Sequence, residues 1–262
     1  MSENISALIT DRTIPYIITE YGSVTSTSTL AIEAAKQGAA EGYTVIADSQ
    51  TEGRGRKVGR HFHSPAHTGL YMSIVLRPKG GYESFLGITS AAAVAVCRAI
   101  SSQTDKRPLI KWVNDILIDG KKVCGILTEA SFLSDGSGLE YAILGVGINI
   151  CPPENGFPDG IKDIAGSVSD TYDATLKDRI AAAFLSEFSR IYGGEEYMDE
   201  YRHLSAVIGK NVSIYRTPTA EISENTPCDK AYAYGIDDDC RLMVRFPDGK
   251  EEVLFSGEIS IR

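Results

Sequence analysis

The chain has 262 residues, of which 43% are hydrophobic and 23% charged, as in an ordinary globular protein. Its 26 Lys and Arg residues and 35 Asp and Glu residues give a net charge of −9, which argues against a general binder of nucleic acid or anionic membranes. The five cysteines are an odd number without a CxxC pair, so no disulfide framework is expected. Without a signal-peptide pattern or a bilayer-spanning apolar stretch, we expect a soluble cytoplasmic protein.

The first part of the chain mixes predicted strands and helices. In chain order, apolar spacing predicts a strand at 16–20, a helix at 29–42, strands at 44–47 and 69–76, a helix at 85–101, and strands at 110–113, 115–118, 121–130 and 141–150. A loop rich in Pro, Gly and Asp follows at 151–173, and helices are expected at 173–192 and 195–204. Because Asp119-Gly120 predicts a hairpin between two of these strands, we expect a mixed rather than a purely parallel sheet.

The pattern changes after residue 204, where only short β-rich runs remain. They cover 207–215, 231–236, 242–246 and 252–262, with a hairpin signal at Asp248-Gly249. We therefore expect an α+β protein of two parts. Residues 1–205 would form a domain with a mixed β-sheet flanked by helices, and residues 206–262 a small barrel-like β module.

A glycine-rich basic loop is the first candidate site. Residues 50–60 read QTEGRGRKVGR and place four cations between positions 54 and 60 of an acidic chain. Arginine binds phosphate and carboxylate groups with paired hydrogen bonds, and glycine lets the backbone approach a ligand closely. The segment is neither a GxxxxGK[ST] phosphate loop nor a GxGxxG turn, because Val58 stands at the third glycine position. It is either a loop that holds a phosphate-bearing ligand or a solvated basic loop without one.

Two further segments combine strand patterns with polar or glycine residues. IKWVND at 110–115 holds the only tryptophan, and its Lys111 needs a negative partner, which is either a ligand or Asp115. GVGIN at 145–149 has two glycines in one predicted strand, which indicates a ligand, a bulge or another backbone against it. Three of the four histidines fall at 61–67, but no carboxylate or cysteine completes a metal site there, so no metal ligand is predicted.

Taken together, these segments resemble the biotin protein ligases. The shared motifs are S-T-(N) at 26–27, Q-T-x-G-R-G-R at 50–56, S-P-x-x-T-G-L-Y-M-S at 64–73, K-W-x-N-D at 111–115, G-I-L-x-E at 125–129, G-x-G-I-N at 145–149 and S-G-E-x-S-I-R at 256–262. Their order and spacing are specific, and they run from about residue 18 to the last residue. The resemblance implies a mixed α/β catalytic domain followed by a small SH3-like barrel, which agrees with the boundary expected near residue 205.

The resemblance implies a ligation in two steps. The carboxylate of biotin attacks the α-phosphate of ATP to give biotinyl-5′-AMP and pyrophosphate. A lysine of a biotin carboxyl carrier protein, or of the carrier domain of a biotin-dependent carboxylase, then displaces AMP. Cationic side chains and Mg²⁺ would offset the charge repulsion of the first step. Nucleic acid and membranes are not expected partners, and the sequence leaves both a monomer and a homodimer open.

The resemblance also implies roles for particular residues. Lys111, Arg54 and Arg56 are expected to be catalytic, with Lys111 bridging the biotin carboxylate and the α-phosphate. Asp115 is expected either to accept the proton of the incoming lysine or to pair with Lys111. Nucleotide contacts are expected for Arg56, Lys111, Asn114 and Asn149. Biotin contacts are expected for Ser26, Thr27, Ser28, Gln50, Gly53, Arg54, Gly55, Arg56, Lys111, Gly125, Gly145 and Gly147.

The chain departs from the family pattern at three places. Ser28 stands where the family has asparagine, Lys57 and Val58 stand where it usually has one residue, and Val113 replaces a common proline. Few residues precede the resemblance, so we expect a form without the N-terminal DNA-binding domain and repressor role of many members. Two alternatives stay open: a lipoate or octanoate ligase of the same fold, and a regulator that binds biotin or nucleotide without catalysis. The GRGR loop and the SGExS end favour biotin, and the intact arginines and lysine favour catalysis.

Overall fold

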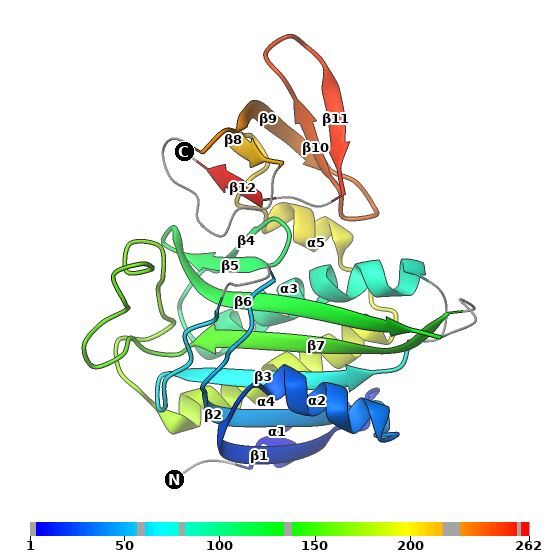
Figure 1. Cartoon of the computed structure of the whole chain (residues 1–262), viewed down its shortest axis with the longest axis vertical. Coiled ribbons are helices and arrows are strands. Elements are labelled where there is room, and N and C mark those ends of the chain that lie inside the picture. Colours follow the sequence, from blue (N-terminus) through cyan, green and yellow to red (C-terminus); the bar gives the residue numbers. More distant parts are fainter. Residues whose placement is uncertain are drawn as a thin grey trace.

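The computed structural model describes residues 4–56, 61–78, 82–133, 138–216, 226–255 and 258–261. A seven-stranded sheet crosses the molecule (Figure 1). In sheet order, the strands are β1 (Ile17–Val24), β2 (Tyr43–Gln50), β3 (Gly69–Leu76), β7 (Leu139–Asn149), β6 (Lys121–Phe132), β5 (Asp115–Ile118) and β4 (Leu109–Lys111). β1 and β2 are parallel and the other neighbouring pairs are antiparallel, which confirms the expected mixed sheet.

Glycines shape the turns that the sequence predicted. The hairpin between β5 and β6 forms at Asp119-Gly120, whose φ angles of 51° and 79° are typical of a type I′ turn. The helix predicted at 29–42 covers Thr27–Lys36 (α2). It ends before Gly38, whose φ of 88° is a left-handed conformation that glycine adopts without strain.

Helices cover both faces of the main sheet (Figure 1). α3 (Tyr82–Gln103) and α4 (Ala174–Tyr192) pack on one face and α2 on the other. β3 is therefore buried along its whole length. Successive side chains of a strand point to opposite faces, so Met72 lies in the core under α3 and α4, whereas Ser73 faces the α2 side. Among the described residues, no helix is long and apolar enough to cross a membrane.

A short helix, α1 (Ile5–Leu8), precedes the first strand and is not predicted, because four residues are too few to show helical spacing. Its Ile5 is buried. The chain that follows is attached to α4: the backbone N–H of Thr10 donates to Ser186 Oγ at 2.9 Å, and a similar bond of 3.2 Å joins Ile14 to Ser189.

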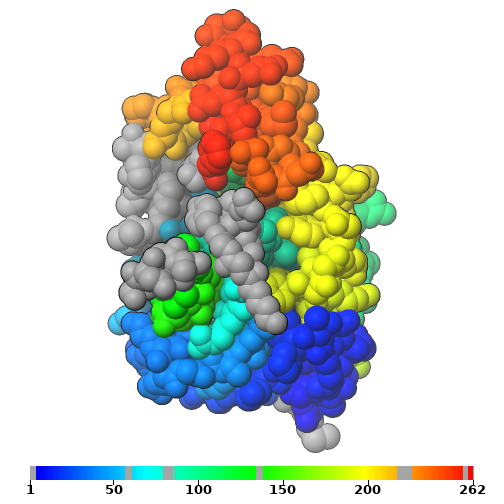
Figure 2. All heavy atoms as spheres, turned by 90° about the vertical axis from the view of Figure 1, so that its right-hand side faces the viewer, coloured from blue at the N-terminus to red at the C-terminus, as the bar shows by residue number. Residues whose placement is uncertain are grey.

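A second sheet forms the other end of the molecule, above α4 and α5 (Met198–His203) in the side view (Figure 2). Its strands pair in the order β11-β10-β9-β8-β12, and all four pairs are antiparallel. The run predicted at 252–262 is two strands rather than one. The bounds are β8 (Lys210–Tyr215), β9 (Asp229–Ile236), β10 (Leu242–Arg245), β11 (Glu251–Leu254) and β12 (Glu258–Ile261). The division of the chain into domains 1–205 and 206–262 stays a prediction.

Buried hydrogen bonds join the main sheet to the C-terminal part of the chain. The indole N–H of Trp112, whose residue is 4% exposed, donates to the carbonyl of Cys240 at 2.8 Å. The backbone N–H of Ile110 donates to Leu204 O, and its carbonyl accepts from the N–H of Ala206, each at 2.8 Å. A single apolar core includes residues of both sheets, so the second sheet packs directly against the β4 side of the first.

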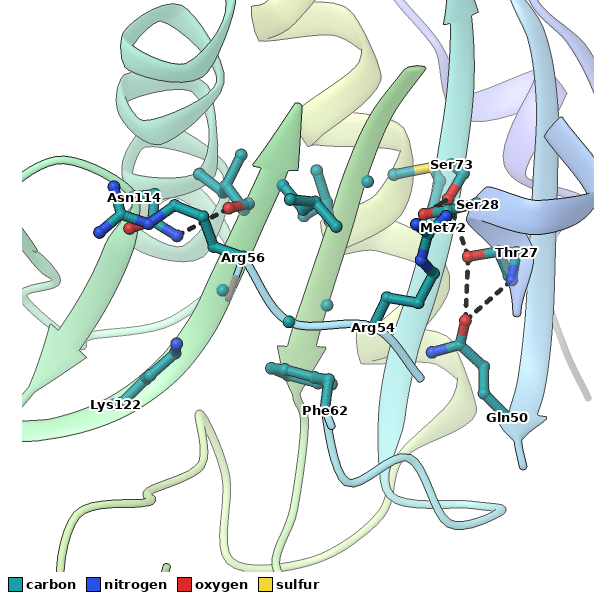
Figure 3. A pocket seen from close by; sticks show the side chains of 17 residues that line it. Thr27, Ser28, Gln50, Arg54, Arg56, Phe62, Met72, Ser73, Asn114 and Lys122 are labelled. Carbon is teal, nitrogen blue, oxygen red and sulfur yellow. Dashed lines mark hydrogen bonds between the residues drawn. The ribbon is translucent and has the colours of Figure 1, made fainter. Parts of the chain in front are cut away.

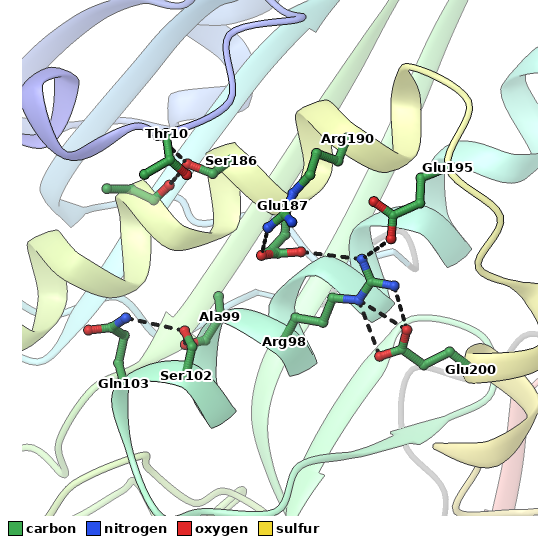
Figure 4. A network of polar contacts seen from close by, with 11 residues as sticks. Thr10, Arg98, Ala99, Ser102, Gln103, Ser186, Glu187, Arg190, Glu195 and Glu200 are labelled. Carbon is green, nitrogen blue, oxygen red and sulfur yellow. Dashed lines mark hydrogen bonds and ion pairs between the residues drawn. The ribbon is translucent and has the colours of Figure 1, made fainter.

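An ion-pair network holds three helical segments together (Figure 4). The guanidinium of Arg98 on α3 lies 3.2 Å from Glu187 on α4, 2.7 Å from Glu195 in the following turn and 2.5 Å from Glu200 on α5. The Arg98 side chain is 22% exposed, so water screens these pairs only in part. Removal of this one cation would take an ion-pair partner from all three carboxylates, of which Glu187 also pairs with Arg190.

Replacement of Arg98 by alanine should lower the free energy of unfolding by about 2–3 kcal/mol, somewhat less than the loss of a fully buried partner. Urea titration measures the change. The control Lys162→Ala removes an exposed pair with Asp159 (2.9 Å) and should cost less than about 0.5 kcal/mol. Equal losses in the two variants would contradict a structural role for the network.

Candidate functional site

A cavity lies on the α2 side of the main sheet, over β3, β7 and β6 (Figure 3). Residues 54–56 and Phe62, the part of the loop after β2 called the covering loop below, also line it. Its volume is about 50 Å³. The structure brings together ten of the fourteen residues expected to contact substrates. Those ten are Thr27, Ser28, Gln50, Arg54, Gly55, Arg56, Asn114, Gly125, Gly145 and Gly147.

One end of the cavity is lined by a chain of hydrogen-bonded polar side chains. The Gln50 amide oxygen accepts from the backbone N–H (2.9 Å) and hydroxyl (3.1 Å) of Thr27, while its Nε2 donates to Ser64 Oγ (3.0 Å). The hydroxyls of Thr27 and Ser28 lie 2.8 and 3.1 Å from Ser73 Oγ. Because hydroxyls and amides can both donate and accept, this end suits a ligand group that carries both C=O and N–H.

Glycines and a phenylalanine ring form the middle of the cavity. The register of β6 and β7 places Gly125 opposite Gly147, and the ring of Phe62 lies against both. A Cβ at Gly147 would be 2.7 Å from Phe62 Cε1. Phe62 also meets Tyr71 edge-on, at 6.3 Å between ring centres, and burial raises the pKa of Tyr71 to about 12. The two glycines therefore make room for a residue of the covering loop.

Arg54 extends from this loop toward the polar end of the cavity (Figure 3). Its Nη2 lies 2.8 Å from Glu129 Oε1 on β6. In the part of the chain that the structure describes, the other oxygen of Glu129 is buried without a hydrogen-bond partner. The cavity is well below the roughly 300 Å³ at which ligand pockets begin. A ligand must therefore displace side chains such as Arg54 or Phe62 as it enters.

Lys122 on β6 adds a further cation to the cavity wall, although it stands outside the motifs. Its Nζ is 2.6 Å from Asp115 Oδ1. Asp115 also lies opposite Lys111 in the pairing of β5 with β4. Lys111 is half-buried at the end of β4 and is not among the lining residues. The structure thus places Asp115 between two lysines, and Lys122 rather than Lys111 reaches the cavity.

Besides that lysine, three expected residues are not among those that line the cavity. Ser26 is the buried N-cap of α2, and within the described ranges its Oγ has no hydrogen-bond partner. Gly53 has no room for a side chain, because a Cβ would meet the carbonyl oxygen of Phe62. Asn149 donates from Nδ2 to Gly166 O at 2.9 Å.

Among the residues that the structure adds to the site, Phe62, Ser73, Lys122 and Glu129 make the contacts described above. Ser73 and Glu129 are the last residues of two motifs, so the motifs themselves carried a signal for them. Phe62 and Lys122 carried no such signal, because only the folded sheet and loop bring them to the cavity. A contact between a loop and a strand far apart in sequence cannot be found from local spacing.

Other segments singled out in the sequence are not among the described residues that line the cavity. The two-residue departure at Lys57 and Val58 and part of the motif at 256–262 lie outside the described residues. His67 pairs with Asp48 at 3.3 Å, and the described ranges contain no group of three His, Cys, Asp or Glu residues placed to hold a metal ion. All five cysteines are free.

Replacement of Gly53 by alanine should loosen the covering loop, since the added Cβ displaces the Phe62 carbonyl. The backbone N–H of Phe62, which donates to Gly53 O at 2.8 Å, should then exchange with solvent at least about tenfold faster, a loss of about 1.4 kcal/mol. Amide hydrogen exchange measures this rate. Gly22→Ala is the control, because its Cβ would enter open space and the Phe62 rate should not change. Equal Phe62 rates in wild type and Gly53→Ala would refute the close contact.

The chain is similar to known proteins of one family. The model of the biotin/lipoate A/B protein ligase family matches residues 21–149. The bifunctional ligase/repressor BirA of Bacillus subtilis is 44% identical over 146 residues, which are 56% of this chain and 44% of that protein. The chain thus matches less than half the length of that relative. The biotin--[acetyl-CoA-carboxylase] ligase of Paracoccus denitrificans is 31% identical over 230 residues, 81% of this chain and 90% of that protein.

A solved structure shows the same fold. Biotin protein ligase from Aquifex aeolicus, in complex with biotin and ATP, superimposes with a TM-score of 0.71 over 94% of this chain and 98% of that one, at 22% identity. The Paracoccus match extends over most of both chains. The chain therefore belongs to the biotin protein ligase family.

Proposed function

We propose that this protein ligates biotin, with ATP, to a lysine of a biotin carboxyl carrier protein by way of biotinyl-5′-AMP. The observation that carries the proposal is a single cavity with hydrogen-bonding side chains at one end and cations near the other. Relatives named as biotin ligases, and the Aquifex ligase solved with biotin and ATP, support the choice of substrates. The proposal covers ligation and not a repressor role, because the residues that support it bind the substrates of ligation.

The polar end suits the ureido ring of biotin. A ureido group has one C=O acceptor and two N–H donors, and Thr27, Ser28, Gln50 and Ser73 offer both donors and acceptors. Ser28, which replaces the asparagine of the family, keeps a contact in this chain through its 3.1 Å bond to Ser73. Ser26 is the buried N-cap of α2, and Gly53 lets the covering loop pass close to the Phe62 carbonyl.

The cationic end suits the reacting groups. A carboxylate attacks a phosphate in the first step, so two anions must approach each other, and positive side chains lower that barrier. Arg56 and Lys122 line the cavity, and Lys111 follows in the strand beside Asp115. Asp115 holds Lys122 through an ion pair of 2.6 Å, so we assign Asp115 a positioning role. Asn114 and Asn149 remain the proposed nucleotide contacts.

Mg²⁺ would enter with the phosphates of ATP. The described residues offer no cluster of three ligand side chains, and Mg²⁺ is usually held by substrate phosphates with one or two carboxylates. When bound, the ion supplies positive charge to the departing pyrophosphate. The residues present fit that arrangement, because Asp115 supplies a carboxylate beside the cavity.

The covering loop would protect the intermediate. An acyl-adenylate hydrolyses readily, so water must be kept from it. Phe62 and Arg54 already cover the strand glycines and the polar end, and both belong to the loop after β2. We further propose that residues 1–205 are the catalytic domain and 206–262 a C-terminal domain, since each range holds one complete sheet.

Pyrophosphate release from ATP tests the proposal, with biotin, lipoate or octanoate as the acid and with or without Mg²⁺. We expect release that requires both biotin and Mg²⁺. Release with lipoate or octanoate instead would keep the fold and change the substrate. Tight biotin binding without release would favour the regulator that binds without catalysis.

Replacement of Lys122 by alanine should slow biotin-dependent pyrophosphate release at least about 100-fold, because a cation at the reacting centre is worth roughly 3 kcal/mol. Lys111→Ala should cause a comparable loss. The neighbouring Lys121 is exposed on the same strand, so Lys121→Ala is the control and should retain the wild-type rate. A near-normal rate in Lys122→Ala would remove this residue from the reaction, and the same outcome in Lys111→Ala would remove Lys111.

Replacement of Glu129 by glutamine should free Arg54 from its ion pair and let it leave the cavity more easily. We expect biotin to associate and dissociate about three- to fivefold faster, as for the loss of a partly exposed pair worth about 1 kcal/mol. Stopped-flow binding gives both rates. The control Glu140→Gln changes an exposed carboxylate that bonds Ser131 at 2.9 Å, and should leave both rates unchanged. Slower association in Glu129→Gln would show that the pair does not restrict entry.

A further inference from the structure

A second cavity lies beside the first, on the side of the C-terminal sheet. Its volume is about 200 Å³, and it shares four lining residues with the first cavity, Arg56, Asn114, Ile126 and Leu127. In Figure 3, Arg56 and Asn114 lie side by side at the end of the first cavity away from Thr27. The remaining wall comes from α3, from Val113 between β4 and β5, from β6, from the turn between β9 and β10, and from Phe255 after β11. Only the shared residues have a role in the adenylation proposed above.

We propose that this second cavity admits the acceptor lysine of the carrier protein to the acyl-adenylate in the first cavity. The inference rests on the proposed function, because it assigns the path of the second substrate. The first step joins a carboxylate oxygen of biotin to the α-phosphorus of ATP, and only the second step brings a nucleophile to the carboxyl carbon. The proposed function assigns biotin and ATP to the first cavity, so the acceptor lysine needs another approach. The shared wall makes the second cavity the adjoining space from which a nucleophile can reach that atom.

The outer rim of the second cavity suits a positively charged side chain. Asp239 lines it with a carboxylate that is 62% exposed and lies 2.9 Å from Arg241 Nη2. Asp237 and Asp238 precede it in the same turn, and Asp238 pairs with Arg202. Three carboxylates and two arginines leave this turn with a net negative charge, which attracts an ammonium group.

The walls suit the carbon chain of a lysine. Apolar residues line the space, among them Phe85 on α3, Ile126 on β6 and Phe255 after β11. A lysine can lay its four methylene groups along such a surface while its nitrogen seeks polar partners. Thr89 and Thr128 offer hydroxyls that now bond each other at 2.8 Å.

The inner end suits a neutral amine. Arg56 lies at the wall shared with the first cavity, and its guanidinium is always charged. An ammonium that moves from water toward this cation and between apolar walls loses stability relative to the amine, so its pKa falls. The amine is the form that attacks a carbonyl. Burial raises the pKa of the Cys240 thiol, so this neighbour stays neutral and adds no negative charge that would favour the ammonium.

The chemistry of the step balances without another reactant. The acceptor ammonium gives one proton to water as it enters, and its Nζ lone pair attacks the carbonyl carbon of biotinyl-5′-AMP. The bond from that carbon to the phosphate oxygen breaks, and AMP leaves with the electron pair. The nitrogen then gives its second proton to the departing phosphate or to water, and a neutral amide remains.

Thr89→Leu and Asp239→Lys test the proposal, since the first narrows the second cavity and the second reverses the charge of its rim. Neither residue lines the first cavity. Biotin-dependent pyrophosphate release, with hydroxylamine to turn over the adenylate, should stay within twofold of wild type for both variants. Single-turnover transfer of biotin from the preformed adenylate to a purified apo carrier domain should slow at least tenfold in Thr89→Leu. In Asp239→Lys, kcat/KM for the carrier should fall at least tenfold.

Asp159→Lys is the control for charge, because Asp159 is exposed on the loop after β7 and lines neither cavity. Its transfer rate should match wild type. Normal transfer in both test variants, or an equal loss in Asp159→Lys, would overturn the proposal. Loss of pyrophosphate release in Thr89→Leu would overturn it as well and would assign the cavity to the phosphates of ATP. A wild-type protein that releases no pyrophosphate with biotin would instead refute the proposed function itself.

Discussion

The site depends on how closely a loop can approach a sheet. β6 and β7 lie in the middle of the main sheet, with one face under α3 and α4, and the cavity forms on the other face, beside α2. Gly125 and Gly147 remove the side chains that would fill this face, and the ring of Phe62 settles there instead. Larger residues at these glycines would push Phe62 and the covering loop away. The arginines on that loop reach the cavity because of this one contact.

The net negative charge of the chain conceals a local cluster of positive side chains. The chain carries −9 overall, yet Arg54, Arg56 and Lys122 converge on one cavity. Two of these cations have a carboxylate partner on the sheet: Arg54 pairs with Glu129, and Lys122 pairs with Asp115. Such pairs hold long side chains in place before substrate arrives, which reduces the ordering that binding must accomplish. Because acidic residues are in excess over the rest of the chain, the positive charge is confined to this cavity.

Much of the fold could be predicted, because the signals for helices, strands and hairpins lie within short stretches of sequence. Apolar spacing placed most strands and helices, and two Asp-Gly pairs placed hairpins, because these signals act over a few residues. Most of the residues that line the cavity belong to the sequence motifs. The sequence could not show that Lys122 rather than Lys111 reaches the cavity, since that depends on which way two antiparallel strands expose their residues. The role of Phe62 could not be predicted either, because the strands that it contacts are distant in sequence.

The contact between the two sheets has a practical consequence. Trp112 is the only tryptophan, and it is buried where its indole bonds the backbone of Cys240 across the junction. Intrinsic fluorescence excited at the tryptophan band therefore reports on one place in the molecule. A shift of its emission would register any movement of the C-terminal sheet relative to the main one, without a label. The protein thus carries its own optical probe at the junction next to the second cavity.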